Sequence, residues 1–260
     1  MNRKAIQLVI PAAGNGIRFR EAGYSQIKPL IPVHGIPMIN WVIGNFELNE
    51  SDQIYIIAKE GDQIENLREE WFKKRRLNLT FVIVEGQTQG PADSVDKVRH
   101  RLDLEMPLVV ANSDQFVNSN LNDFILKVCN STSAGSILTM NASGNKWSYV
   151  ERDADGLVHK VVEKVEISNE ATVGIYGWQK ASYFFNSFDR MVSQNDRTNN
   201  EFYVAPSYNY LIESGLKVSA VNIGMVEEKV FGLGTPEDLD TFLLKRDFLQ
   251  LAEALKLSLE

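Results

Sequence analysis

The sequence is poor in the residues on which disulfide scaffolds and many metal centres depend, because its 260 residues include one cysteine and three histidines. Cys129 cannot form an intramolecular disulfide, and no Cys/His cluster has the spacing of metal ligands. No apolar run approaches the ~18 residues that span a bilayer, and the run over 6–14 turns too early for a signal peptide. These absences predict a cytoplasmic protein without membrane insertion.

Positive charge is also scarce, since 27 Lys and Arg residues face 34 Asp and Glu residues, a net charge of −7. Without a global positive field, nucleic acid is not an expected partner. The basic run over 73–76 is typical of the solvated C-terminal end of a helix. With 44% hydrophobic and 23% charged residues, the chain has an ordinary globular composition, and its length fits one large domain.

In the first half of the chain, short runs rich in Val and Ile alternate with segments of helical spacing. The predicted strands lie near 6–11, 54–58, 79–84 and 108–111. The predicted helices lie near 37–46, 62–73 and 91–102. Strands that are apolar on both faces and alternate with helices predict a parallel sheet covered on both sides, with ligands bound beyond the carboxyl ends of the strands.

After Asn120 the predicted strands alternate polar and apolar side chains, which favours antiparallel pairing. These strands lie near 136–140, 147–152, 157–163 and 172–178. The whole pattern predicts an α/β protein, Rossmann-like, with a mixed, mainly parallel central sheet flanked by helices and a smaller antiparallel part. We predict one domain over 1–240, with halves at about 1–120 and 121–240, and a C-terminal helix over 241–260 whose apolar face is compatible with a homo-oligomer.

A glycine loop follows the first predicted strand, in the sequence VIPAAGNGIRF. Gly14 and Gly16 permit backbone conformations in which successive N–H groups close around an anion. The alternative is an ordinary strand-to-helix turn that binds no ligand, which could use the same glycines. The dinucleotide fingerprint fails at Phe19, and no Gly-Lys-Ser/Thr completes a P-loop. Arg18 inside the loop and Lys28 after it add two cations that favour a polyphosphate ligand.

With these cations, PAAGNGIRF…KPLIPVHGIPMI resembles the signature loop of the sugar-1-phosphate nucleotidyltransferases, which reads G-x-G-x-R with a downstream Lys-Pro. Further segments resemble the same family, in family order: GQTQGPADSV (86–95), ANSDQF (111–116), VVEKVEISNEATVGIYGW (161–178) and GLGTPEDL (232–239). The resemblance spans roughly residues 5 to 240. It implies the nucleotidyltransferase fold, with a nucleotide-binding first half and an acceptor-binding second half.

The resemblance also implies a reaction in which an acceptor phosphate attacks the α-phosphorus of a nucleoside triphosphate and pyrophosphate leaves. Arg18 and Lys28 would be catalytic, next to a triphosphate held by loop residues Ala12, Ala13, Gly14, Asn15 and Gly16. Asp114 would be catalytic and would bind Mg²⁺, because a carboxylate at a strand end suits this hard cation. The family usually supplies a second Asp where this chain has Gly232, so either Glu227 or Glu228 substitutes or that contact is missing.

The remaining site residues follow from the resemblance, except Tyr149, which is an aromatic residue that could cover an acceptor. Those expected to bind the nucleotide base are Gln87, Gly90, Asp93 and Ser94, and the Ser-Val at 94–95 favours a pyrimidine, with a leaning toward CTP. Those expected to bind the acceptor are Tyr149, Glu163, Lys164, Gly174 and Glu201. The alternative for Lys164 is an exposed charge pair with Glu163 on a half-buried strand, and aromatic residues in strands are more often core residues.

The leading hypothesis is therefore a Mg²⁺-dependent transferase that activates a phosphorylated sugar or polyol for surface polysaccharide. One alternative is a catalytically silent, nucleotide-sensing relative, which the glycine at 232 favours. The other is a nucleotide-sugar-dependent glycosyltransferase, which would be expected to carry Asp-x-Asp where this chain reads Ser113-Asp114-Gln115.

Overall fold

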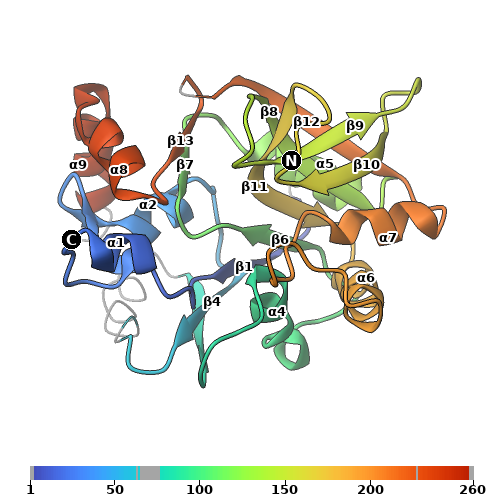
Figure 1. Ribbon diagram of the computed structural model, residues 1–260, viewed down its shortest axis with the longest axis horizontal. Coiled ribbons are helices and arrows are strands. Elements are labelled where there is room, and N and C mark those ends of the chain that lie inside the picture. The colour runs from blue at the N-terminus through green and yellow to red at the C-terminus, as the bar shows by residue number, and fades with distance from the viewer. Residues whose placement is uncertain (1–2, 63, 65–76, 227, 258–260) are drawn as a thin grey trace.

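A computed structural model describes residues 3–62, 64, 77–226 and 228–257, and its first half forms the parallel centre of the main sheet (Figure 1). The strands of this part are β1 (Gln7–Pro11), β4 (Gln53–Lys59), β5 (Asn78–Val84) and β6 (Leu108–Ala111). β1 pairs in parallel with both β4 and β6, and β4 pairs in parallel with β5. The predicted parallel strands are thus confirmed.

The second half extends the same sheet mostly by antiparallel pairing. Its strands are β8 (Gly135–Asn141), β9 (Ser148–Arg152), β10 (Val158–Glu163), β11 (Glu170–Trp178) and β12 (Val218–Met225). β11 pairs antiparallel with β6, and the sheet runs in the order β10-β9-β11-β6-β1-β4-β5. β8 branches from this order by pairing with β11, and β12 pairs with β8. The predicted mixed α/β fold with an antiparallel part is therefore confirmed.

Helices cover both faces of the sheet because successive side chains of a strand point to opposite sides. Val9 of β1 belongs to a buried cluster with α4 (Pro91–Asp96), α6 (Ala181–Ser193) and α7 (Ser207–Glu213). Its neighbours Leu8 and Ile10 belong to a second cluster with α2 (Met38–Gly44) and α5 (Asn122–Asn130). The sheet is thus the middle layer between two helical layers.

A third buried cluster is rich in aromatic side chains, and the helices that contribute to it lie at the left in Figure 1. It contains the short ladder of β7 (Gln115–Val117) and β13 (Val230–Gly232), with α8 (Pro236–Leu243) and α9 (Leu249–Leu257). Phe116, Phe231 and Phe242 lie ring to ring inside it. The small ladder matters for function because it fixes the segment after β6 against the segment before α8.

Several predicted helices have different limits in the structure. The helix predicted over 91–102 ends as α4 at Asp96 and continues as a 3₁₀ turn, η3 (Arg99–Arg101), where Arg99 contacts both Asp96 and Asp189. The contact between Arg99 and Asp189 is the tertiary one, and it competes with continuation of the α-helix beyond Asp96. The helix predicted over 241–260 is interrupted between α8 and α9 by the 3₁₀ turn η4 (Arg246–Phe248).

Short elements without a clear sequence signal connect the glycine loop to α2. They are η1 (Lys28–Leu30), β2 (Pro32–Val33) and β3 (Ile36–Pro37). The helix predicted over 62–73 and the basic run over 73–76 fall almost wholly outside the described residues. Among the helices within the described ranges, none is long and apolar enough to cross a membrane.

Candidate active site

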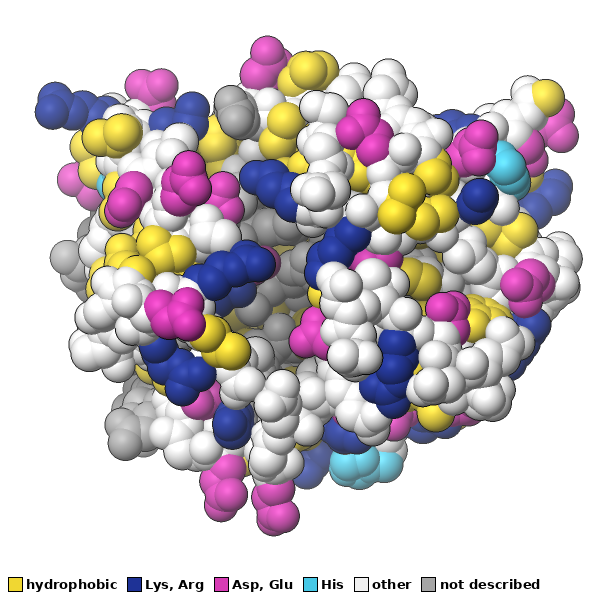
Figure 2. Space-filling view, in the orientation of Figure 1, with side chains coloured by type: hydrophobic (Ala, Val, Ile, Leu, Met, Phe, Trp, Pro, Cys, Tyr) yellow, Lys and Arg dark blue, Asp and Glu magenta, His cyan; other side chains and the backbone are white. Residues whose placement is uncertain are grey.

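A cleft with a volume of about 780 Å³ opens where the two halves of the chain meet. One wall comes from the ends of β1 and β6, and the facing wall comes from β9, β10 and β11, with residues 201–205 and 232–238 at the sides. The molecule is hollowed at this place, and Lys and Arg side chains border the hollow (Figure 2). Segments far apart in sequence thus meet at the carboxyl ends of parallel strands, as predicted.

The glycine loop leads from β1 directly into α1 (Ile17–Glu21). Gly16 has a φ of 56°, a left-handed conformation that glycine adopts without a side-chain clash. A Cβ at this position would lie 3.4 Å from the Cβ of Lys28, so the loop packs closely on the start of η1. The residues of the loop that line the cleft include Ala13, Gly14, Asn15, Gly16 and Arg18.

Ala12 was predicted to bind nucleotide but does not line the cleft. Its side chain is buried, and its N–H donates to the carbonyl of Ile57 at 2.7 Å. Ala12 therefore extends the pairing of β1 with β4 and supports the loop from below. The prediction that it contacts the ligand is not supported by its position.

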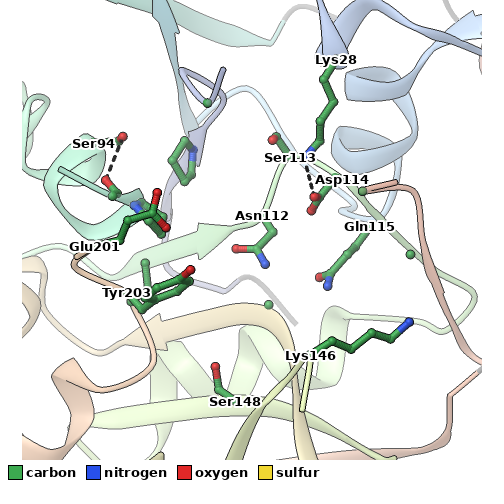
Figure 3. Close-up of a pocket in the computed structure, with 18 of the residues that line it drawn as sticks. Lys28, Ser94, Asn112, Ser113, Asp114, Gln115, Lys146, Ser148, Glu201 and Tyr203 are labelled. Carbon is green, nitrogen blue, oxygen red and sulfur yellow. Dashed lines mark hydrogen bonds and ion pairs between the residues drawn. The ribbon is translucent and has the colours of Figure 1, made fainter. Parts of the chain in front are cut away.

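Lys28 and Asp114 meet inside the cleft, where Lys28 Nζ lies 2.5 Å from Asp114 Oδ2 (Figure 3). Their side chains are 21% and 24% exposed, so both remain accessible to a ligand. The carbonyl of Asp114 accepts a hydrogen bond from Leu233 N at 2.8 Å, which fixes its backbone. Within the described part of the chain, Arg18 has no hydrogen-bond or ion-pair partner, so its guanidinium is available for an anion.

The Asp114 carboxylate fits a cation such as Mg²⁺, which usually binds through one or two carboxylates, substrate phosphates and water. Gly234 keeps open the space beside this carboxylate, because a Cβ there would lie 2.6 Å from Asp114 Oδ2. The residues that the structure describes contain no group of three or more His, Cys, Asp or Glu side chains arranged to hold a metal. A single carboxylate with open space beside it suits a cation that also binds substrate phosphates.

The structure describes one of the two glutamates considered as substitutes for the second metal carboxylate, and that one lies away from the cleft. Glu227 lies outside the described residues, and Glu228 is exposed in a turn and does not line the cleft. Gly232 itself does line the cleft.

The segment predicted to recognise the base follows β5 and leads into α4. Gly90 has a φ of 121°, and a Cβ there would lie 2.7 Å from both the nitrogen and the oxygen of Phe202. Phe202 N donates to Gln89 O at 2.8 Å, and Ala92 N donates to Phe202 O at 3.0 Å. Glycine is therefore required for the close backbone approach that ties this segment to the loop carrying Glu201.

Three of the four predicted base-binding residues line the cleft, namely Gln87, Gly90 and Ser94. Asp93 does not: its carboxylate accepts a hydrogen bond from Gln89 N at 2.8 Å and pairs with Lys97 Nζ at 2.8 Å. It faces a neighbouring groove on the other side of the segment. Because successive residues of a helical turn face different directions, Asp93 stabilises the turn while Ser94 reaches the cleft.

On the facing wall, Glu163 and Lys164 lie at the end of β10 and both line the cleft. Burial raises the pKa of Glu163, although a hydrogen bond from Ser148 and the charge of Lys164 oppose this. Lys164 has a φ of 58°, unusual for a residue with a side chain, and its Nζ donates to Tyr203 Oη at 2.5 Å. Such local strain is common where a functional side chain must be aimed.

Glu201 and Tyr203 complete this wall. Burial raises the pKa of Tyr203 well above its ordinary value, and the nearby Glu201 carboxylate raises it further. The phenol therefore keeps its proton at neutral pH and can both donate and accept hydrogen bonds.

Gly174 of β11 lies opposite the Asp114 segment, with a φ of 84°. A Cβ there would lie 2.4 Å from both Asn112 Nδ2 and Gln115 Oε1, so the two amides pack directly on the glycine. In Figure 3 both amides point toward the open centre of the cleft. Glycine is therefore required at the predicted position 174, because any side chain there would clash with these two amides.

Tyr149 was predicted to cover the acceptor, but its side chain is buried and its hydroxyl donates to Gly144 O at 2.5 Å. Alternation along β9 explains this, because Ser148 faces the cleft and the next side chain must face the core. The two-residue alternation of side chains along this strand would have favoured Ser148 as the residue that faces the cleft.

The polar residues that line the cleft and that sequence reasoning missed include Asn112, Gln115, Lys146, Tyr203 and Asp238. The two amides flank Asp114 in ANSDQF, and Tyr203 lies two residues after Glu201. Those spacings are usable signals. Lys146 and Asp238 had no such signal, because they meet only through the fold.

Comparison with known proteins places this chain in a family. Residues 7–211 match the family model described as nucleotidyl transferase. The chain is 24% identical to the bifunctional protein GlmU of Acetivibrio thermocellus over 262 residues, which covers 96% of this chain and 51% of that protein. It thus spans about half the length of the curated relatives it matches.

Solved structures share the fold. A nucleoside-diphosphate-sugar pyrophosphorylase from Vibrio cholerae RC9 superposes with a TM-score of 0.79 at 23% identity, covering 92% of this chain and 100% of that one. A UDP-glucose pyrophosphorylase complexed with UDP-glucose has a TM-score of 0.74 at 16% identity, covering 93% and 98%. The chain belongs to the nucleotidyl transferase family, and its resemblance to the sugar-1-phosphate nucleotidyltransferases is confirmed.

Proposed function

We propose that the protein transfers a nucleoside monophosphate from a nucleoside triphosphate to a phosphorylated sugar or polyol and releases pyrophosphate. The observation that carries this proposal is one cleft in which Arg18 and the Lys28–Asp114 pair lie on one wall and Glu163 and Lys164 on the other. Such chemistry depends on positioning and charge neutralisation more than on a covalent nucleophile.

In this reaction an oxygen of the acceptor phosphate forms a bond to the α-phosphorus, and the bond from the α-phosphorus to the bridging oxygen breaks. The glycine loop and Arg18 would bind the β- and γ-phosphates and neutralise the charge that develops on pyrophosphate. Lys28 would leave Asp114 and bind the α-phosphate and the attacking phosphate. Its position beside Gly16 supports this role, because the loop and the ammonium group share one wall.

Mg²⁺ would bind at Asp114 and neutralise the triphosphate. The partly exposed Asp114 carboxylate supports this cation, and Asp114 would orient it from the segment that follows β6.

The acceptor would bind between Glu163, Lys164, Glu201 and Gly174. Lys164 would contact the acceptor phosphate, while the carboxylates accept hydrogen bonds from hydroxyl groups. Tyr203 supports this assignment because its hydroxyl orients Lys164 Nζ. For the base we propose a pyrimidine, with CTP as the first candidate, because Ser94 faces the cleft at the start of α4. The product would serve as an activated precursor of surface polysaccharide.

The test is pyrophosphate release with Mg²⁺, crossing the five common nucleoside triphosphates with a panel of sugar and polyol phosphates. Release that requires one nucleotide, one acceptor and Asp114 is the expected result. Nucleotide binding without release across the panel would favour a silent, nucleotide-sensing relative instead. Equal rates with all five triphosphates would remove the pyrimidine assignment alone.

A further inference from the structure

Asp238 occupies the space beside Gly232, the position at which the sequence lacks an expected carboxylate. A Cβ built on Gly232 would lie 3.5 Å from Asp238 Oδ2 and 3.6 Å from its carboxyl carbon. Both residues line the cleft. The carboxylate missing from the chain at 232 is therefore matched by one that arrives from the first turn of α8.

The local backbone places Asp238 and Asp114 along the same side of one short segment. Leu233 is fully buried in the aromatic cluster, so its neighbours Gly232 and Gly234 face the other way, into the cleft. Asp114 lies beside Gly234, just as Asp238 lies beside Gly232. Two carboxylates thus border the cleft over two glycines that leave them room.

A buried amide oxygen without a partner lies on the same side of this ladder. Gln115 pairs directly across from Gly232 and is only 7% exposed. Its Oε1 has no hydrogen-bond partner among the residues that the structure describes, although it lines the cleft. Opposed residues of an antiparallel pair share a face of the ladder, and a buried acceptor without a donor calls for a ligand or water.

Capping of α8 explains only half of the Asp238 carboxylate. Thr235 Oγ1 accepts a hydrogen bond from Asp238 N at 3.1 Å and donates to Oδ2 at 2.8 Å, a capping arrangement. The other oxygen, Oδ1, lies 3.6 Å from Lys146 Nζ, beyond hydrogen-bond range. Lys146 is 62% exposed, so this long ion pair can be replaced easily.

We propose that Asp238 supplies the second carboxylate for the divalent cation that accompanies the triphosphate, and that Lys146 holds this carboxylate when the cation is absent. The inference rests on the proposed function, because it uses the same cation. It also assigns the side-chain oxygen of Gln115, Oε1, which has no hydrogen-bond partner among the described residues, as a further ligand of the cation. The chain thereby replaces an Asp at 232 by a carboxylate from a neighbouring helix.

The test is direct binding of Mn²⁺, measured from the free-ion electron paramagnetic resonance signal of the whole protein. Asp238→Asn keeps an oxygen for Thr235 but loses the charge, and we expect Mn²⁺ affinity to fall about ten- to a hundredfold. Asp240→Asn, on the exposed side of α8, is the matched control and should bind as the unchanged protein does. Thermal unfolding of both variants checks that α8 stays folded.

Two further variants separate a ligand from a capping residue. Lys146→Met removes the competing ammonium group and should tighten Mn²⁺ binding by roughly two- to fivefold, and this gain should disappear when Asp238→Asn is also present. Gly232→Asp, added to Asp238→Asn, should restore much of the affinity, because the space at 232 accepts a Cβ at ordinary contact distance.

The outcomes distinguish this inference from the proposed function. If Asp238→Asn binds Mn²⁺ like Asp240→Asn while Asp114→Asn binds it weakly, the role of Asp238 is wrong and the cation at Asp114 stands. If Asp114→Asn and Asp238→Asn both bind like the control, both metal assignments are wrong. Were Asp238→Asn to unfold, weaker binding by Lys146→Met would overturn the inference by itself.

Discussion

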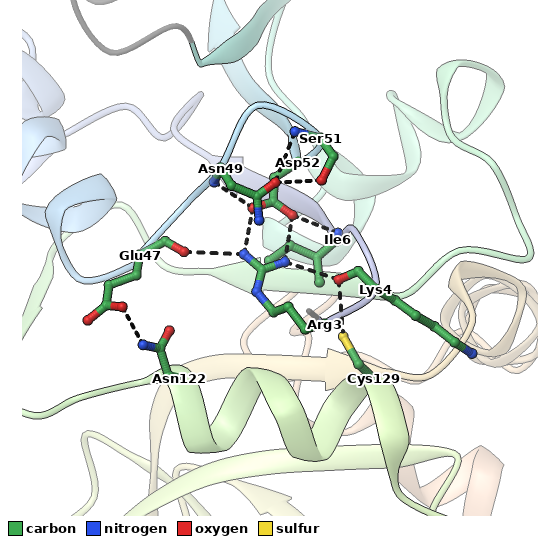
Figure 4. A network of polar contacts seen from close by, with 9 residues as sticks. All are labelled: Arg3, Lys4, Ile6, Glu47, Asn49, Ser51, Asp52, Asn122 and Cys129. Atoms are coloured by element: carbon green, nitrogen blue, oxygen red, sulfur yellow. Dashed lines mark hydrogen bonds and ion pairs between the residues drawn. The ribbon is translucent and has the colours of Figure 1, made fainter. Parts of the chain in front are cut away.

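Two aspartates of this chain each pair with a basic side chain, yet their surroundings differ. Asp52 is fully buried, and its oxygens accept hydrogen bonds from Arg3, Ile6 N and Asn49 N (Figure 4). Asp114 Oδ2 accepts only from Lys28 in the described part of the chain, in an open cleft. A saturated carboxylate stabilises the fold, whereas one with free lone pairs beside a cleft remains able to bind a ligand.

The largest effect expected from this comparison is on stability. Asp52→Ala leaves two backbone N–H groups without an acceptor and leaves the Arg3 guanidinium without a counter-charge, with only backbone carbonyls to accept from it. We expect a loss of about 3–5 kcal/mol. Urea unfolding measures it. Removing Asp52 should leave the pyrophosphate release of the folded protein within about twofold, and a large loss of turnover in folded Asp52→Ala would break the comparison.

Asp114→Asn should show the reverse pattern. Pyrophosphate release should fall at least about a hundredfold, because the charge that holds the cation and orients Lys28 is gone. Since both side chains of the pair are partly exposed, the free energy of unfolding should change by no more than about 1 kcal/mol. A pyrophosphate-release assay measures the rate, and urea unfolding of the same preparation measures the free energy of unfolding. A loss of stability as large as that of Asp52→Ala would contradict the assignment.

Glu170 and Glu163 extend the comparison to pH. Burial alone would raise the pKa of Glu170, but hydrogen bonds from Arg152 and Thr139 outweigh it, so the pKa is lowered. The ionised form therefore stabilises the fold above the unfolded pKa, and this contribution is lost as pH falls through the lower folded pKa. Glu170→Gln should cost about 1–2 kcal/mol at pH 7 and progressively less as the solution is acidified, measured by thermal unfolding from pH 7 to 3.

How far the sequence predicts such differences depends on the range of the interactions involved. The parallel strands and the glycine loop follow from local pattern, the proposed metal position follows from a family resemblance, and Lys28 and Asp114 indeed meet in the structure. Tyr149 and Asp93 were assigned to the site although alternation and helical turn direct them away from it. The Asp238–Lys146 contact joins residues that only tertiary packing brings together, so no local signal could reveal it.

The smallest expected effect tests the cleft side of the same comparison. Burial raises the pKa of Glu163, so ionisation is unfavourable in the folded protein, and the stability present below the unfolded pKa is lost as pH rises through the folded one. Glu163→Gln removes that penalty while its amide oxygen can still accept from Ser148. We expect a gain of up to about 1 kcal/mol at pH 7 that vanishes in acid, opposite in sign to Glu170→Gln.

The same variant should raise the KM for the acceptor several-fold, because the carboxylate lies in the cleft and not in the core. A loss of stability at pH 7 equal to that of Glu170→Gln would show that both carboxylates serve the fold, and it would remove Glu163 from the proposed acceptor site.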